Sequence, residues 1–127
     1  MAVILDTNAL SAWLGGDRSL QHHLETAQRI LLSPIALGEF RFGVLASRHR
    51  ATYEQRLRVI EQEFPPLPIN GITAAHYAAL RRELAAKGRP IPWHDLWIAA
   101  QARQHQLPVL SRDEHFDAVP DLQRIAW

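Results

Sequence analysis

Cysteine is absent from the 127 residues of this chain. Its absence excludes disulfide bonds, thiolate metal sites and a cysteine nucleophile. The fold must then be stabilised by its core, and a chain of this length with 47% hydrophobic residues can form one. We therefore expect a single domain over residues 1–127 and, because disulfides are rare in reducing compartments, a cytoplasmic protein.

Long apolar runs and an excess of one charge are also missing. No stretch reaches the length of a membrane span, and the first five residues lead into Asp6 without the features of a signal peptide. The net charge of +1 is too small for a protein that holds DNA by bulk charge. Only one of the 14 basic residues is lysine, Lys87. Arginine suits bidentate phosphate contacts, but a GC-rich genome explains this bias equally well.

Short apolar runs alternate with helical patterns along the chain. Strands are predicted at residues 2–5, 30–32, 67–69, 108–110 and 122–127. Helices are predicted at residues 9–14, 19–28, 34–47, 52–63, 73–87 and 94–106, with a short helix near Glu114. This alternation predicts an α/β fold of three layers, α/β/α, with a mostly parallel central sheet.

Four acidic residues are expected to meet at one edge of that sheet. Asp6 ends the first strand, and Asp113 lies three residues past the strand at 108–110. Ligands of parallel sheets bind beyond the carboxyl ends of the strands. Asp95 opens a helix after a proline-rich loop, and Glu39 stands on an otherwise apolar helix, where it is not expected to reach bulk water easily.

Carboxylates crowded together in this way repel one another, and some would take up protons. A hard divalent cation removes the conflict, because Mg²⁺ and Mn²⁺ prefer oxygen ligands. Such an ion polarises a phosphoryl oxygen and acidifies water, which is sufficient for hydrolysis of a phosphodiester. The pattern therefore predicts a site for Mg²⁺ or Mn²⁺.

Each acid also has a purely structural interpretation. Asp6 can cap the helix that follows it, and Asp95 can complement a helix dipole. Residues 111–114 fit a capping box, which would leave Asp113 a solvated acid of the first turn. Glu39 can pair with an arginine on the surface. The metal hypothesis therefore depends on all four acids together.

The remaining polar candidates are less specific. Asp117 follows Asp113 by one turn, but a solvated surface acid is the better interpretation. The seven histidines do not form a ligand set, and His94 beside Asp95 either contacts substrate or covers the turn. Trp93 and Trp97 are interpreted as packing residues rather than base-stacking platforms.

The order and spacing of five short segments match a known family. They are residues 3–10 (VILDTNAL), 33–39 (SPIALGE), 88–92 (GRPIP), 95–100 (DLWIAA) and 109–116 (VLSRDEHF). Over essentially its whole length the chain resembles a PIN-domain ribonuclease of the VapC toxin type. His94 departs from the usual pattern, since the family often has asparagine or another small polar residue there.

The resemblance implies a metal-dependent endoribonuclease that cuts structured RNA such as tRNA or rRNA. It assigns the acidic site to Asp6, Glu39, Asp95 and Asp113, and supporting hydroxyls to Thr7 and Ser111. It also implies a homodimer, and a cognate antitoxin that pairs with the toxin in a type II toxin–antitoxin system.

Two other classes of function stay open at this stage. A phosphatase or phosphate-accepting domain is one, although such enzymes need a second aspartate where this chain has Asn8. The other is a non-catalytic binding module whose acidic cleft docks a basic partner. A response to divalent metal separates that module from an enzyme.

Overall fold

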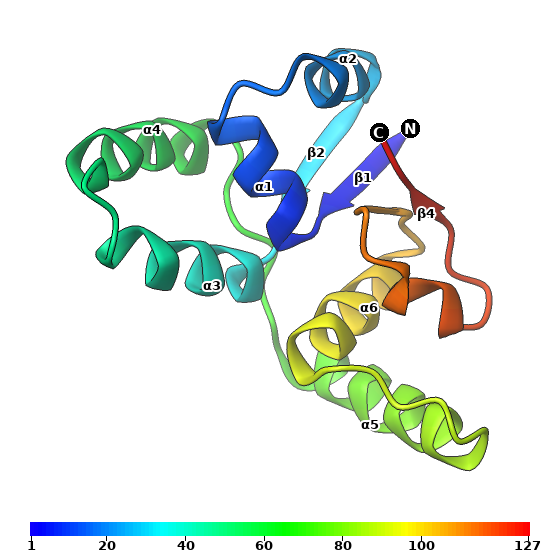
Figure 1. The fold of residues 1–127 in the computed structure, drawn as a ribbon. Coiled ribbons are helices and arrows are strands. Elements are labelled where there is room, and N and C mark those ends of the chain that lie inside the picture. Colours follow the sequence, from blue (N-terminus) through cyan, green and yellow to red (C-terminus); the bar gives the residue numbers. More distant parts are fainter.

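The computed structural model describes all of residues 1–127, with a sheet between two groups of helices (Figure 1). The strands are β1 (Ala2–Leu5), β2 (Arg29–Leu32), β3 (Val109–Leu110) and β4 (Arg124–Ile125). The helices are α1 (Thr7–Leu14), α2 (Arg18–Thr26), α3 (Pro34–Leu45), α4 (Arg50–Glu63), α5 (Gly71–Ala86), α6 (Trp93–His105) and the short 3-10 helix η1 (Glu114–Ala118). None of them combines the length and the apolar character that a membrane crossing needs.

All four strands run parallel, in the order β2-β1-β3-β4. Ile4 of β1 pairs with Leu31 on one side and with Val109 on the other. The chain leaves β1 towards β2 and later crosses back to β3, so the winding reverses between β1 and β3. Open α/β sheets bind ligands beyond the carboxyl ends of the strands at such a reversal.

Two hydrophobic cores lie on opposite faces of the sheet. Successive side chains of a strand point to opposite faces. Val3 and Leu5 accordingly join a cluster with α1, α2 and α4, whereas Ile4 joins a second cluster with α5, α6 and η1. Helix α3 contributes to both clusters. The three-layer α/β/α architecture predicted from the sequence is confirmed.

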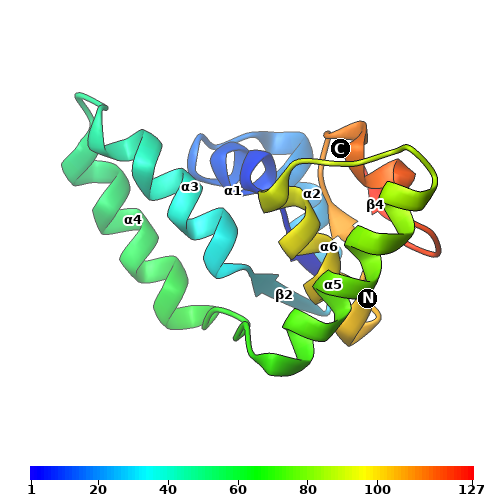
Figure 2. The ribbon, with the colours of Figure 1, turned by 90° about the horizontal axis from the view of Figure 1, so that it is seen from below.

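Helices α3 and α4 pack side by side as a hairpin at one end of the sheet (Figure 2). Helix α3 begins as predicted: the Ser33 hydroxyl accepts a hydrogen bond of 3.1 Å from the backbone N–H of Ile35, and Pro34 occupies the first helical position. This start places Glu39 in the middle of α3, on the side of the hairpin that faces α1.

The strand predicted at 67–69 does not form. Pro66 makes a single isolated bridge to Leu32, and the backbone N–H of Leu67 donates to the Leu32 carbonyl at 2.8 Å. Pro66 and Pro68 have no N–H to continue the ladder, so the pairing ends there.

The last two strands are shorter than predicted. Val109 donates to the Gln123 carbonyl and Ser111 to the Ile125 carbonyl, both at 2.9 Å. The next backbone N–H, that of Arg112, is diverted to a side chain and leaves the sheet. As a result β4 covers two residues of the predicted 122–127, and the chain after Ser111 turns towards the end of β1.

Candidate metal centre

The ends of β1 and β3 place two polar residues next to each other. Leu5 pairs with Leu110 in the parallel register, so Asp6 and Ser111 are the first residues beyond the two strands. The Ser111 hydroxyl donates to Asp6 Oδ2 at 2.8 Å, and the backbone N–H of Asp6 donates to the Leu110 carbonyl at 3.2 Å. These contacts hold the Asp6 carboxylate at the reversal point of the sheet.

A pocket of about 330 Å³ opens beyond these strand ends, and none of its lining residues is hydrophobic. The lining residues are Asp6, Thr7, Asn8, Ser11, Glu39, His94, Asp95 and Asp113. All four acids selected from the sequence thus line one pocket, together with the expected Thr7 and His94.

Asp6 is almost completely buried, with 3% of its surface exposed. It occupies the cap position of α1, which begins two residues earlier than predicted, but its side chain makes no capping hydrogen bond. Burial raises the pKa of Asp6, against the opposing effect of the Ser111 hydroxyl. The structural interpretation of Asp6 as a helix cap therefore does not account for its carboxylate.

Asp95 is the third residue of α6 and is 2% exposed. Burial raises its pKa to about 6, although the hydrogen bond from His115 acts in the opposite direction. The neighbouring charges of Asp6 and Asp113 raise this pKa further. A helix-dipole acid at the surface would keep an ordinary pKa, so the burial points to a different role.

Glu39 enters the pocket from α3. Its Oε1 accepts a hydrogen bond of 2.9 Å from the Thr7 hydroxyl, and its Oε2 lies 3.7 Å from His94 Nε2. The same His94 nitrogen lies 3.7 Å from Asp95 Oδ1. The expectation that Glu39 is shielded from water is wrong, since 35% of its side chain is exposed. It forms the rim of the pocket, and Asp6 and Asp95 form the floor.

Asp113 caps η1 itself, because its carboxylate accepts a hydrogen bond of 2.9 Å from the backbone N–H of His115. The alternative interpretation of residues 111–114 as a capping box with Ser111 as cap therefore does not hold. The Ser111 hydroxyl instead accepts a hydrogen bond of 2.9 Å from the backbone N–H of Asp113, while it donates to Asp6. One buried hydroxyl thus positions two of the four acids.

His115 was not selected from the sequence, yet it contacts the site directly. Its Nδ1 lies 2.9 Å from Asp95 Oδ2 and 3.0 Å from Asp113 Oδ1. The hydrogen bond with Asp95 raises the pKa of His115. The only available signal was its position two residues after Asp113. The short 3-10 helix η1 brings His115 back towards α6.

Asn8 also serves the site without carrying charge. Its amide Nδ2 donates to the Ser111 hydroxyl at 3.4 Å, and its Oδ1 accepts from the backbone N–H of Arg112 at 3.3 Å. These bonds tie α1 to the loop that carries Asp113. An amide engaged in this way cannot supply the second carboxylate of a phosphatase, which weighs against that alternative.

The donor set fits a hard divalent cation. Four carboxylates line the pocket, and none of them pairs with an arginine or lysine. The basic side chains within 4 Å of these carboxylates are His94 and His115. Buried carboxylates that share a pocket favour protonation unless a cation is present, and oxygen donors suit Mg²⁺ and Mn²⁺.

Comparison with known proteins identifies the family. A family model described as PIN domain matches residues 3–122. The chain belongs to the PIN-domain family. Ribonuclease VapC5 of Mycobacterium tuberculosis is 37% identical over 120 residues, which cover 93% of this chain and 87% of that protein.

Solved structures of PIN-family toxin–antitoxin pairs share the fold. That of VapBC-5 from Mycobacterium tuberculosis aligns with a TM-score of 0.79 and 32% identity, covering 99% of this chain and 98% of that one. That of VapBC2 from Rickettsia felis, bound to a promoter DNA fragment, aligns with a TM-score of 0.88 and 25% identity, covering 100% and 99%. The predicted resemblance to VapC-type PIN domains is confirmed.

Three of the less specific candidates, Asp117, Trp93 and Trp97, do not line the PIN acidic pocket. Arg124 binds the Asp117 carboxylate with two hydrogen bonds of 2.8 and 2.9 Å and thereby lowers its pKa, in agreement with the surface interpretation of Asp117. Trp97 packs as predicted, stacked on Tyr77 with ring centroids 3.9 Å apart. The packing interpretation of Trp93 is wrong, since 71% of it is exposed.

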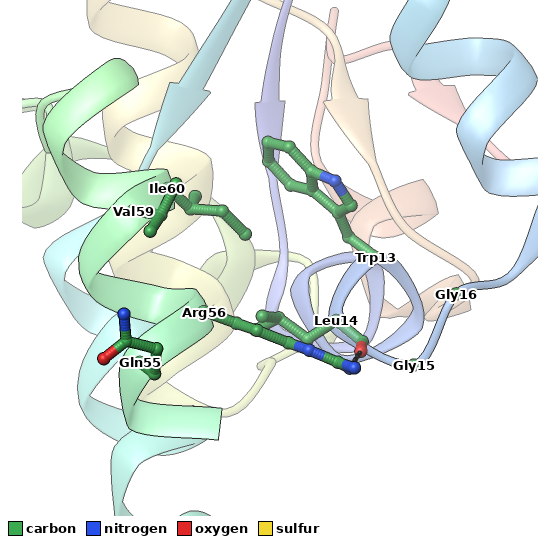
Figure 3. Close-up of a pocket in the computed structure, with 8 residues that line it drawn as sticks. All are labelled: Trp13, Leu14, Gly15, Gly16, Gln55, Arg56, Val59 and Ile60. Atoms are coloured by element: carbon green, nitrogen blue, oxygen red, sulfur yellow. Dashed lines mark hydrogen bonds between the residues drawn. The ribbon is translucent and has the colours of Figure 1, made fainter. Parts of the chain in front are cut away.

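A second, largely apolar pocket of this PIN domain lies between α1 and α4 (Figure 3). Trp13 and Leu14 project into it from α1, and Val59 and Ile60 from α4. Across its edge, Arg56 donates a hydrogen bond of 2.9 Å to the Leu14 carbonyl. The pocket shares no lining residue with the acidic site.

Proposed function

We propose that this PIN-domain chain is a metal-dependent endoribonuclease, the toxin of a type II toxin–antitoxin pair, and that it hydrolyses phosphodiester bonds of structured RNA of the tRNA or rRNA class. The observation that carries the proposal is the placement of Asp6 and Asp95, two buried carboxylates of raised pKa, at the reversal point of the sheet with no arginine or lysine beside them. The relatives named as ribonucleases support the same activity.

Some of these residues would hold the ion, and others would hold the carboxylates in position. Asp6 and Asp95 would bind Mg²⁺ or Mn²⁺ directly, and Asp113 and Glu39 would complete the ligand set from the two sides of the pocket. A bound ion supplies a Lewis acid for a phosphate oxygen and lowers the pKa of water.

Supporting hydroxyls hold the carboxylates in place around the pocket. Ser111 fixes the Asp6 carboxylate through its hydrogen bond of 2.8 Å, and Thr7 fixes Glu39 through one of 2.9 Å. His94 lies at the exposed mouth within 3.7 Å of Glu39 and Asp95, where an RNA phosphate would enter. We assign His94 to substrate positioning.

The test is cleavage of total tRNA and rRNA by the purified protein with Mg²⁺, Mn²⁺ or EDTA. Asp6→Asn and Asp95→Asn each keep the size of the side chain and remove the charge. We expect both to lose at least a hundredfold in cleavage rate, the scale on which single ligands contribute to metal-assisted hydrolysis. Asp117→Asn is the matched control, since Asp117 is a surface acid held by Arg124. Full metal-dependent activity in Asp6→Asn would refute the proposal.

The partners form part of the proposal. We propose a cognate antitoxin, a homodimer and a cytoplasmic place of action. The solved toxin–antitoxin pairs that share this fold support an antitoxin partner. The apolar pocket between α1 and α4 (Figure 3) offers a surface that a hydrophobic segment of such a partner could cover without displacing the acids. Light scattering of the purified chain, with and without a candidate antitoxin protein, measures both associations.

A further inference from the structure

His115 is held beside the acidic site by the fold of η1. Phe116, its neighbour, is completely buried in the core formed with α5 and α6. Asp113 accepts the backbone N–H of His115 and thereby starts the 3-10 turn. Because both neighbours are anchored, the imidazole projects between two segments of the site, the start of α6 and the loop after β3.

One ring nitrogen of His115 meets two carboxylates. Nδ1 lies 2.9 Å from Asp95 Oδ2 and 3.0 Å from Asp113 Oδ1. One possible ligand atom from each of the three residues lies within 4.8 Å of those of the other two. Neighbouring ligands at about 2.1 Å from an octahedral ion are about 3.0 Å apart, so these spacings suit shared coordination.

A hydrogen bond from Nδ1 explains its distance to Asp95 or its distance to Asp113, but one proton does not explain both distances equally well. A neutral imidazole carries at most one proton on Nδ1, and here two carboxylate oxygens compete for it. A cation between the three atoms would give Nδ1 and the two carboxylate oxygens a shared partner. No arginine or lysine supplies that charge at this point.

We propose that His115 is a metal ligand of this site, binding through Nδ1 beside Asp95 and Asp113, and that its nitrogen makes the site select Mn²⁺ over Mg²⁺. The inference rests on the proposed metal-dependent function and adds the identity of the ion. Mg²⁺ prefers oxygen donors, whereas imidazole nitrogen raises the affinity for first-row transition ions. An all-carboxylate site would discriminate less between the two ions.

His94 provides a matched control within the same pocket. It faces the other oxygen of Asp95, Oδ1, at 3.7 Å, and its side chain is 47% exposed against 53% for His115. Both histidines therefore border the same carboxylate at similar exposure. Only His115 lies at a distance compatible with shared coordination.

Pulsed electron paramagnetic resonance of Mn²⁺ bound to the RNA-free protein tests the ligand directly. A coordinated imidazole gives a nitrogen hyperfine coupling that carboxylates and water do not give. We expect the coupling in the unmodified protein and in His94→Gln, and its loss in His115→Gln and His115→Asn. A coupling that is absent from the unmodified protein, or that survives both His115 substitutions, overturns the inference.

Calorimetric titration with Mn²⁺ and with Mg²⁺ tests the selectivity. We expect His115→Gln to lower Mn²⁺ affinity about tenfold or more and Mg²⁺ affinity much less. Equal losses for both ions refute the selection of Mn²⁺. If the unmodified protein cleaves RNA with Mn²⁺ but shows no nitrogen coupling, only the role of His115 is refuted. If the unmodified protein binds neither ion, the proposed function is refuted as well.

Discussion

Replacing Asp95 by asparagine should remove a pH-dependent part of the protein's stability. Asparagine has nearly the same shape but cannot ionise. The Asp95 carboxyl has a pKa of about 6 in the folded protein, against 3.8 for an ordinary aspartate. The folded state therefore binds more protons than the unfolded state between these values, so the free energy of unfolding falls as the pH rises through this range.

The size of the effect follows from the two pKa values. At pH 5 the pH is about one unit below the pKa of the carboxyl in the folded protein. At pH 8 the carboxyl is ionised in both the folded and the unfolded protein. The unmodified protein should thus lose about 1.4 kcal/mol relative to Asp95→Asn between pH 5 and pH 8. The same contact raises the pKa of His115, and this interaction already enters the pKa of Asp95, so it is not counted a second time.

Urea unfolding in EDTA at the two pH values measures the effect as a difference between the two proteins. Asp117→Asn is the control, because Arg124 lowers the pKa of Asp117 and leaves it ionised over the whole range. We expect no pH-dependent difference for that variant. If the difference between the unmodified protein and Asp95→Asn stays constant from pH 5 to pH 8, burial does not raise the pKa of Asp95 and the electrostatic argument for the site fails.

Three further substitutions test other contacts. Thr7→Val removes the hydroxyl that binds Glu39 and should lower the cleavage rate at saturating Mn²⁺ by about tenfold to a hundredfold, with an unchanged thermal midpoint. Phe116→Ala empties a fully buried position beneath His115 and should lower the free energy of unfolding in urea by about 3–5 kcal/mol. Gln101→Leu leaves the Leu67 carbonyl without its donor and should cost about 1–3 kcal/mol in the same assay. An unchanged free energy of unfolding would contradict the burial of Phe116 in the first case and the hydrogen bond from Gln101 to Leu67 in the second.

Three of the acids could be found from the sequence because Asp6, Asp95 and Asp113 stand at or near element boundaries that local patterns reveal, whereas Glu39 was conspicuous as a carboxylate on an otherwise apolar helix. Asp6 follows an uninterrupted apolar run, and Asp95 follows a loop whose prolines must end before a helix. The parallel order of the strands then brings their ends together without any knowledge of side-chain contacts. That these four acids bind metal stays a prediction.

His115 could not be found in this way. Its approach to Asp95 depends on a five-residue 3-10 turn whose direction is set by the burial of Phe116. Periodicity carries no signal over so short an element. The missing strand at 67–69 has a similar origin, because hydrophobic residues among prolines suggest a strand while the absent N–H groups prevent one.

The residues that meet at Asp6 come from distant parts of the chain, and this affects the protein during its synthesis. Ser111 Oγ contacts Asp6 Oδ2 across 105 positions, and Asp113 and His115 lie further on. A ribosome adds residues from the N-terminus, so a nascent chain that has exposed only β1 to α6 has neither the hydroxyl that holds Asp6 nor the strand that brings it there. No earlier translation intermediate contains the assembled pocket, because Ser111, Asp113 and His115 must all have emerged before their contacts can form.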